Sequence, residues 1–196
     1  MRMTRTGGLF SIKEVTYGPT HHFYGFHDLV QWNAKGDLML GLEVSDISHP
    51  PYLEDRIASG VIDPGAKKFY KIHETSAFNY PQGARQQWVG SSDLFVCNDM
   101  VGSGWGAHLS DAREGKIVQT FSFPIHCLDA DSGSAYYMDY SRLHRVGGYG
   151  YTGVEDQFIS EDIPSGTGIF KANIKSCESE LLFSIKDVAA CSPTGV

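Results

Sequence analysis

Apolar residues in this chain come in short runs separated by polar turns that contain glycine. The clearest example is the segment 20–42, where Trp32 is followed by a polar turn over 33–37 and then by the apolar run 38–42. A short apolar run bounded by turn residues is typical of a β-strand. The pattern therefore predicts a strand, a tight turn and a second strand in the first forty residues.

The same arrangement recurs along the chain. A second hairpin is predicted around Asp63-Pro64-Gly65-Ala66, a strong turn sequence, and further pairs of turns fall near 91 and 113 and near 132 and 176. Four strands in every 40 to 60 residues, roughly, are expected of propeller blades rather than of helical solenoids. We therefore predict an all-β fold with three to four β-propeller blades of four antiparallel strands each. The blades are expected at about 20–78, 79–124 and 125–186, within a single domain over 20–196 that follows a lead-in strand and turn over 1–19.

The composition agrees with a strand-rich globular chain. Of the 196 residues, 41% are hydrophobic, and the chain contains ten Tyr, eleven Phe and 22 Gly. Aromatic side chains fit a half-buried pleated surface, and glycine fits tight turns. The four cysteines lack a C-x-x-C pair, so we expect free thiols rather than disulfides or a zinc site.

Charge and hydropathy exclude several classes of partner. The net charge is -7 and no cluster of five basic residues occurs, which argues against nucleic acid. No segment approaches the roughly 20 apolar residues of a membrane helix, and the N-terminus lacks the apolar stretch of a signal peptide. We therefore expect no membrane partner and a cytoplasmic location.

Polar residues on the predicted inner strands form the candidate site. In a propeller the first strand of each blade lines a central channel, and these strands are predicted at 23–31, 83–89 and 125–129. Imidazole can bind a transition metal or act as a general base, and Arg suits a carboxylate ligand. The candidates are His22, His27 and Asp28 from the first blade, Arg85 and Gln86 from the second, His126 and Asp129 from the third, and Arg142 and His144 on the loop that follows.

Each candidate also has a purely structural interpretation. The histidines can cap strand ends or form hydrogen bonds in the channel wall, and Arg85 and Arg142 can pair with Asp99, Asp129 or Asp139. Trp32 and Trp88 occupy equivalent positions in their blades, which favours packing over ligand stacking. The glycine-rich segment 147–168 is predicted to be an inserted loop, either a recognition element or a surface excursion.

Three segments resemble a known family. HHFYGFHD followed by W-x-x-x-G-D, then QGARQQW, then SRLHRVGGYGY, are similar to the oligogalacturonate-lyase-like and TolB-like β-propellers, especially a branch often encoded near bacterial surface-glycan genes. The resemblance implies a ring of six or seven blades and a divalent metal of the manganese type. It implies that His22, Gln86 and His126 hold the metal, with histidine or arginine assisting. From their expected place at the channel mouth, we assign His27, Arg85 and Arg142 to catalysis and Asp28, Asp129 and His144 to ligand contact.

Two functions remain open at this point. The first is a glycan-binding or interaction-platform propeller, and the second is a metal-assisted lyase acting on acidic, uronate-containing saccharides. Three blades form only an open arc, which exposes unpaired strand edges and an apolar inter-blade face. We therefore also expect self-association through these open edges.

Overall fold

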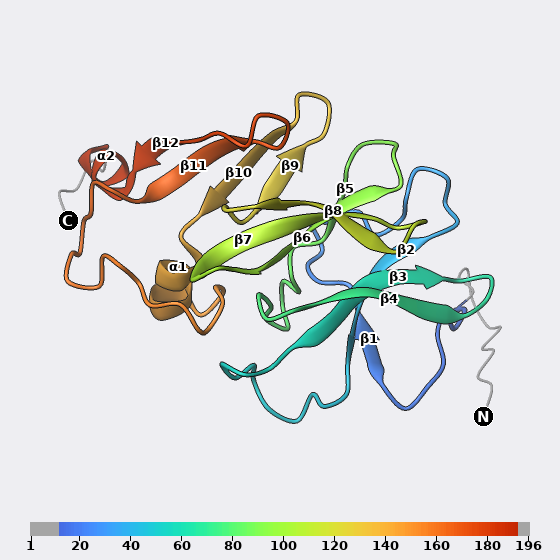
Figure 1. Cartoon of the computed structure of the whole chain (residues 1–196). Coiled ribbons are helices and arrows are strands. Elements are labelled where there is room, and N and C mark those ends of the chain that lie inside the picture. The colour runs from blue at the N-terminus through green and yellow to red at the C-terminus, as the bar shows by residue number, and fades with distance from the viewer. Residues whose placement is uncertain (1–11, 192–196) are drawn as a thin grey trace.

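The computed structural model describes residues 12–191, which are mostly β, with 39% of residues in strands and 8% in helices. The strands form three four-stranded antiparallel sheets (Figure 1). The first sheet contains β1 (His21–Phe23), β2 (Met39–Val44), β3 (Ile57–Asp63) and β4 (Lys68–Thr75). The second contains β5 (Gln87–Trp88), β6 (Leu94–Val101), β7 (Gly104–Asp111) and β8 (Lys116–Phe121). The third contains β9 (Cys127–Asp129), β10 (Ser134–Met138), β11 (Gly168–Asn173) and β12 (Ser179–Ser184).

In every sheet, consecutive strands are neighbours, so each sheet is a simple meander. The three sheets coincide with the repeats predicted at 20–78, 79–124 and 125–186, and the prediction of repeated four-stranded antiparallel units is confirmed. No sheet within residues 12–191 is closed. The predicted lead-in strand lies partly outside the described residues, and 12–19 form no strand.

Two short helices belong to the last repeat. Helix α1 (Tyr140–Gly147) follows β10, and α2 (Ile185–Ala190) follows β12. The Asp139 carboxylate accepts hydrogen bonds from the backbone N–H groups of Ser141 and Arg142, which caps the start of α1. The prediction that Arg142 and His144 lie on a loop is therefore wrong, because this cap begins a helix there. None of the helices described is long and apolar enough to cross a membrane.

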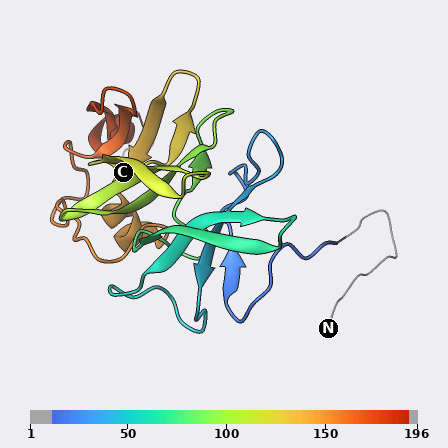
Figure 2. The same cartoon turned by 45° about the vertical axis from the view of Figure 1, so that its right-hand side comes forward.

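The second sheet lies between the other two (Figures 1 and 2). Because side chains alternate along a strand, Phe95 and Cys97 of β6 face the first sheet, where they pack on Leu40 and Leu42. Val96, on the opposite face of β6, packs with residues of the third sheet that include Ala135 and Ala172. One apolar layer thus lies between the first and second sheets, and another lies between the second and third.

Each sheet has the same irregularity between its third and fourth strands. The register shifts at Ser59/Gly60, at Leu109/Ser110 and at Ile169/Phe170. A glycine lies in the third strand of each sheet where the fourth strand approaches closely. A Cβ atom would lie 2.0 Å from the Tyr70 carbonyl oxygen at Gly60, 2.4 Å from that of Phe121 at Gly106 and 2.0 Å from that of Phe183 at Gly168. The three sheets therefore share the same bulge and the same close approach between their third and fourth strands.

The two tryptophans predicted to be equivalent do occupy equivalent places. Trp32 forms an isolated bridge with Met39 at the start of β2, and Trp88 of β5 pairs with Phe95 of β6. Trp88 packs against the first core and its indole N–H donates to the Gln31 carbonyl at 2.8 Å. Packing is thus its main role, whereas Trp32 stays partly exposed.

Candidate functional site

A buried arginine joins the leading segments of all three sheets. Arg85, only 1% exposed, precedes β5 and donates to both Asp28 carboxylate oxygens, at 3.1 and 3.0 Å. Its Nε and Nη2 atoms also donate to the backbone carbonyl oxygen of His126, at 3.0 and 2.5 Å. Asp28 follows β1 and His126 precedes β9, so a single guanidinium group connects the three repeats.

The backbone around Arg85 is shaped to place this side chain. Arg85 has a φ of 53°, which is unusual for a residue other than glycine. Gly25 comes so close to the segment before Arg85 that a Cβ atom there would lie 2.7 Å from the Gln82 carbonyl oxygen. The Gln87 amide donates to the carbonyl oxygens of Arg85 and His126, at 3.1 Å each. This close approach of two loops keeps Asp28 within reach of Arg85.

Aromatic and amide side chains hold His126 in place through hydrogen bonds and ring stacking. Its Nδ1 atom lies 3.1 Å from the Tyr140 hydroxyl, and the Tyr140 ring stacks on Tyr151 with centroids 4.3 Å apart. Asn98 donates to the Tyr151 hydroxyl and to the Ile125 carbonyl oxygen, at 3.0 Å each. Burial raises the pKa of both tyrosines, so they remain neutral hydrogen-bonding groups.

The charges at this centre are set by burial and by Arg85. Burial acts to raise the pKa of Asp28, but the hydrogen bonds and charge of Arg85 outweigh it, so the pKa is lowered and Asp28 is ionised. Burial, and then the charge of Arg85, lower the pKa of His126. At neutral pH the centre therefore contains an anionic carboxylate, a guanidinium cation and a neutral imidazole.

The surface next to this centre is aromatic and polar. The Asp28 side chain is 44% exposed, whereas Arg85 behind it is buried. His27 is exposed, and its ring centroid lies 4.2 Å from that of Phe26. Tyr24 is also exposed. Tyr24, Phe26 and His27 thus lie in the same loop as the fixed carboxylate of Asp28, and we call these residues the 24–28 segment.

Of the residues predicted for the site, the structure brings together Asp28, Arg85 and His126. The partner of Arg85 is Asp28, so the predicted pairing with Asp99, Asp129 or Asp139 is wrong. The reason is that the loop after β1 folds against the segment before β5. Asp129 instead accepts hydrogen bonds from Ser132 and the Asp131 backbone within its own exposed turn.

The residues predicted to hold a metal have separate partners. His22 Nε2 lies 3.0 Å from a Glu43 oxygen, the Gln86 amide donates to the Gly41 carbonyl oxygen at 2.9 Å, and His126 contacts Tyr140. Within residues 12–191, no group of three or more His, Cys, Asp or Glu side chains is arranged to hold a metal ion. That finding does not cover glutamine, and Gln86 Oε1 has no hydrogen-bond partner in the described chain, so the manganese-type donor set stays a prediction. All four cysteines are free, as expected, with Cys97 buried and the others exposed.

Arg142 has a structural partner in the inserted loop. Its guanidinium group pairs with Asp156 at 3.3 Å and donates to the carbonyl oxygens of Phe158, Glu161 and Asp162 at 2.9 to 3.2 Å. These contacts fasten the loop to α1 and account for the burial of Arg142. His144 is exposed on the same helix. Neither residue forms a hydrogen bond to Asp28, Arg85 or His126 among the contacts of the described chain.

A second polar cluster, which the sequence patterns did not single out, lies between the first and second sheets. His108 Nε2 is 3.3 Å from an Asp99 oxygen, and Arg56 is 3.6 Å from the same carboxylate. His73 is buried beside His108, and neither of its ring nitrogens has a hydrogen-bond partner in the described chain. Burial, followed by the charge of His108, lowers the pKa of His73 to about 4. We call His73, Asp99 and His108 the inter-sheet cluster.

Sequence reasoning also missed Gln87, Asn98, Tyr140 and Tyr151. Gln87 adjoins a predicted candidate and Tyr151 lies in the glycine-rich segment, but nothing local to either residue indicates its partner. Comparison with protein-family models, with curated proteins and with solved structures finds no significant match to this chain. The class of the protein thus stands as a mostly β chain of three repeated four-stranded sheets, and its function is argued from its geometry.

Proposed function

We propose that this chain is a β-propeller-like binding module that holds a saccharide at the 24–28 segment. Meander sheets in sequence order, with equivalent bulges and a buried centre between their first strands, support the interpretation of the sheets as blades. Fold alone does not define activity. The functional proposal therefore rests on the surface beside Arg85.

The observation that supports it most directly is the geometry of Asp28. Its carboxylate is half-exposed, ionised and held by a bidentate pair with a buried arginine. A fixed carboxylate is a strong acceptor for the hydroxyl groups of a sugar, and it is oriented before the ligand arrives. The adjacent rings of Tyr24, Phe26 and His27 offer an apolar surface for the C–H face of a pyranose ring.

The same geometry favours a neutral saccharide over an acidic one. Arg85 makes four hydrogen bonds to Asp28 and His126, and a guanidinium group has five N–H groups. Little of its donor capacity is left for a uronate carboxylate. The exposed charge at the surface is the negative one on Asp28, and the whole chain has a net charge of -7.

The lyase alternative has less support. It requires a metal at His22, Gln86 and His126, and one nitrogen of each residue already has a different partner: Glu43, the Gly41 carbonyl oxygen and Tyr140. Ultraviolet absorbance during incubation with a uronate polymer tests it, because β-elimination leaves a conjugated, absorbing product.

A glycan array followed by titration calorimetry tests the binding proposal. We expect the chain to bind neutral oligosaccharides more tightly than uronate oligomers. Changing Tyr24→Ala is expected to weaken binding about threefold to tenfold, since an aromatic contact contributes about 0.5 to 1.5 kcal/mol. His27→Ala is expected to act in the same direction.

The matched control is Tyr70→Ala, which removes an exposed tyrosine from β4, outside the 24–28 segment. Its affinity is expected to equal that of the unchanged protein. Absence of binding to every neutral saccharide on the array would contradict the proposal. An equal loss of affinity in Tyr24→Ala and Tyr70→Ala would also contradict it, because the effect would not be local.

A further inference from the structure

The third sheet has an apolar face that no other part of the described chain covers. Met138, Ile169 and Phe183 form one cross-strand row on β10, β11 and β12. Phe183 is 57% exposed and Ile169 is 44% exposed. Val146 of α1 and Val188 of α2 extend the apolar surface at the ends of this row and are also exposed. We call these five residues the outer face.

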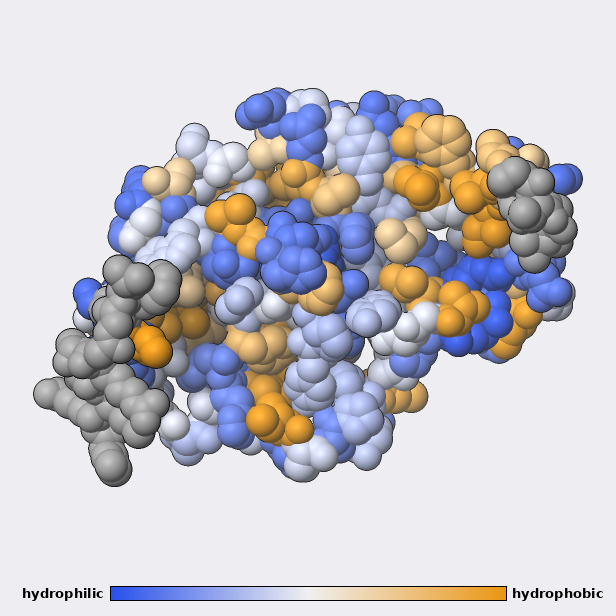
Figure 3. All heavy atoms as spheres, turned by 180° about the vertical axis from the view of Figure 1, so that it is seen from behind, coloured by the Kyte–Doolittle hydropathy of each residue, from blue (hydrophilic) through white to orange (hydrophobic). Residues whose placement is uncertain are grey.

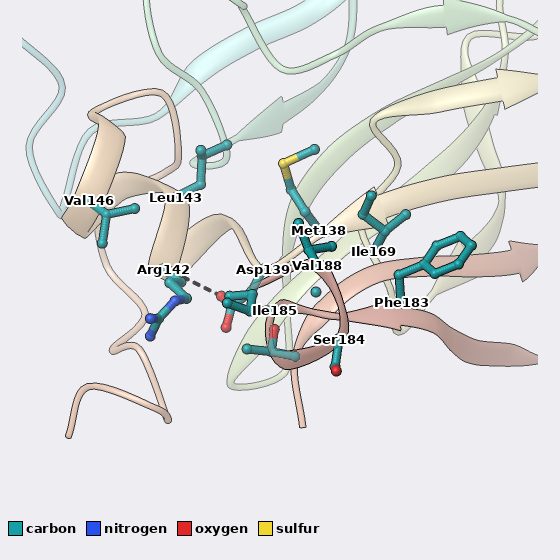
Figure 4. A pocket seen from close by; sticks show the side chains of 12 residues that line it. Met138, Asp139, Arg142, Leu143, Val146, Ile169, Phe183, Ser184, Ile185 and Val188 are labelled. Atoms are coloured by element: carbon teal, nitrogen blue, oxygen red, sulfur yellow. Dashed lines mark hydrogen bonds between the residues drawn. The ribbon is translucent and has the colours of Figure 1, made fainter. Parts of the chain in front are cut away.

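The outer face surrounds a hollow of about 260 Å³, which is lined mainly by apolar side chains. Figure 4 shows that these side chains come from both helices and from the strands between them. Apolar side chains also gather on the side of the molecule that contains the third sheet, as Figure 3 shows. An exposed apolar surface with a central hollow is typical of an interaction site.

Side-chain alternation shows which side of the sheet this is. Ala135 and Ala172 face the second sheet and belong to the core between the two. Met138 and Ile169 lie an odd number of residues away from them and point to the opposite side. The outer face is therefore on the side of the third sheet that points away from the second sheet.

The corresponding sides of the other two sheets are both covered. The first sheet places Leu40 and Leu42 against the second sheet, and the second places Val96 and Ala107 against the third. In each case one sheet buries its apolar side chains on the next sheet. The outer face is the same kind of surface, without a further sheet in the described chain.

The far side of the first sheet is a poor partner for it. Alternation places Glu43 and the cross-strand row Met39, Ile62 and Phe69 on that side. Ile62 is only 5% exposed, and Met39 and Phe69 are partly buried. His22, which pairs with Glu43, adds polar groups there. A second copy joined head to tail would therefore meet less exposed apolar surface there than the outer face itself offers.

We propose that the outer face binds the outer face of a second copy of this chain, so that two copies form a closed, two-fold symmetric dimer. A surface that meets itself about a two-fold axis brings apolar side chains onto apolar side chains. Lys171 and Glu180 lie across from each other on the same side of the sheet. A two-fold axis can place the Lys171 of each copy near the Glu180 of the other, which makes the polar end of the face self-complementary.

Light scattering after size exclusion, over a concentration range of about a hundredfold, tests this dimer. We expect the unchanged chain to reach twice its monomer mass of 21.6 kDa and to stop there. Ile169→Glu and Phe183→Glu are each expected to restore the monomer mass at every concentration, because a charge would be buried in the contact.

The matched control is Ile117→Glu, which places the same charge on β8, the fourth strand of the second sheet, at a residue that is 41% exposed. It is expected to remain dimeric, and circular dichroism is expected to show that all three variants are folded. A monomer at all concentrations overturns the proposal, and so does an unchanged mass in Ile169→Glu and Phe183→Glu. Growth beyond the dimer also overturns it, because head-to-tail association does not close.

Discussion

Arg85→Met is expected to lower the free energy of unfolding by about 2 to 4 kcal/mol. The substitution removes the only cation that contacts the Asp28 carboxylate in the described chain and takes two donors from the His126 carbonyl oxygen. Breaking a fully buried ion pair typically costs about 3 to 5 kcal/mol. The expected loss is smaller because Asp28 is half-exposed and water can solvate it once Arg85 is gone.

Equilibrium unfolding in urea measures this effect, and Arg113→Met is the matched control. Arg113 pairs with Asp37 and Asp93, but its side chain is 41% exposed. The same substitution there is expected to cost less than about 1 kcal/mol, as for other surface ion pairs. Arg85→Lys is expected to behave like Arg85→Met, since an ammonium group cannot form the two-armed contact. Equal stabilities of Arg85→Met and Arg113→Met would show that Arg85 does not join the sheets.

A double-mutant cycle separates the ion pair from the other contacts of Arg85. Asp28→Asn leaves a buried guanidinium group without its counter-charge, so we expect this variant to be destabilised as well. The double variant Asp28→Asn with Arg85→Met is expected to lose about 1 to 3 kcal/mol less than the sum of the single losses. Strict additivity would mean that the two side chains are not coupled.

The inter-sheet cluster is expected to make the protein less stable in mild acid. His73 has a pKa of about 4 in the folded chain, against 6.5 for an unperturbed histidine, because it is buried and faces His108. Between these two values the unfolded chain binds the proton and the folded chain does not. The contribution of neutral His73 is therefore complete above pH 6.5 and is lost as the pH falls toward 4.

The size of the pH effect follows from the shift in pKa. One pKa unit corresponds to about 1.4 kcal/mol, so the shift of His73 amounts to at most roughly 3 to 4 kcal/mol of folding free energy. Asp99 attracts the protonated form of His73 and Arg56 repels it, and the pKa of His73 already includes both effects. Asp99 itself titrates below this range, since the donors around it outweigh its burial and lower its pKa.

Urea unfolding at several values between pH 7 and pH 4.5 measures this dependence. In His73→Phe and His73→Gln, stability is expected to fall less steeply with acid than in the unchanged protein. His144→Gln removes an exposed histidine from α1 and is expected to keep the full dependence. A curve for His73→Phe that runs parallel to that of the unchanged protein would show that His73 does not titrate on unfolding in this range.

The repeated architecture could be predicted from the sequence because its signals are local. The turn at 63–66 joins β3 and β4 as expected, and the apolar run 38–42 forms most of β2. The strand predicted at 23–31 is wrong, because only His21–Phe23 pairs with β2 and the following segment folds into a loop toward Arg85. The equivalence of Trp32 and Trp88 was likewise visible in the sequence and holds in the strand pairing. Helix α1 was missed because it is short, its start depends on the single capping carboxylate of Asp139, and it runs directly into the glycine-rich segment 147–168.

The site was predicted only in part. The expectation that leading segments of successive repeats meet was enough to group Asp28, Arg85 and His126. It could not show that Arg85 binds Asp28 rather than Asp129, because that pairing depends on how the loop after β1 folds against the segment before β5. It also could not show that Arg142 forms an ion pair with Asp156, since that contact depends on how the inserted loop folds back on α1.

The sequence by itself determined most of the strands, the turns between them and the number of sheets, because hydrophobic alternation and turn residues act over a few neighbouring positions. The tertiary structure alone decided which polar side chains are paired and which apolar face stays uncovered. Ion pairing depends on distances of a few ångströms between residues such as Asp28 and Arg85, 57 positions apart. The exposure of Ile169 and Phe183 likewise depends on which sheet lies against which, and only the assembled chain defines that.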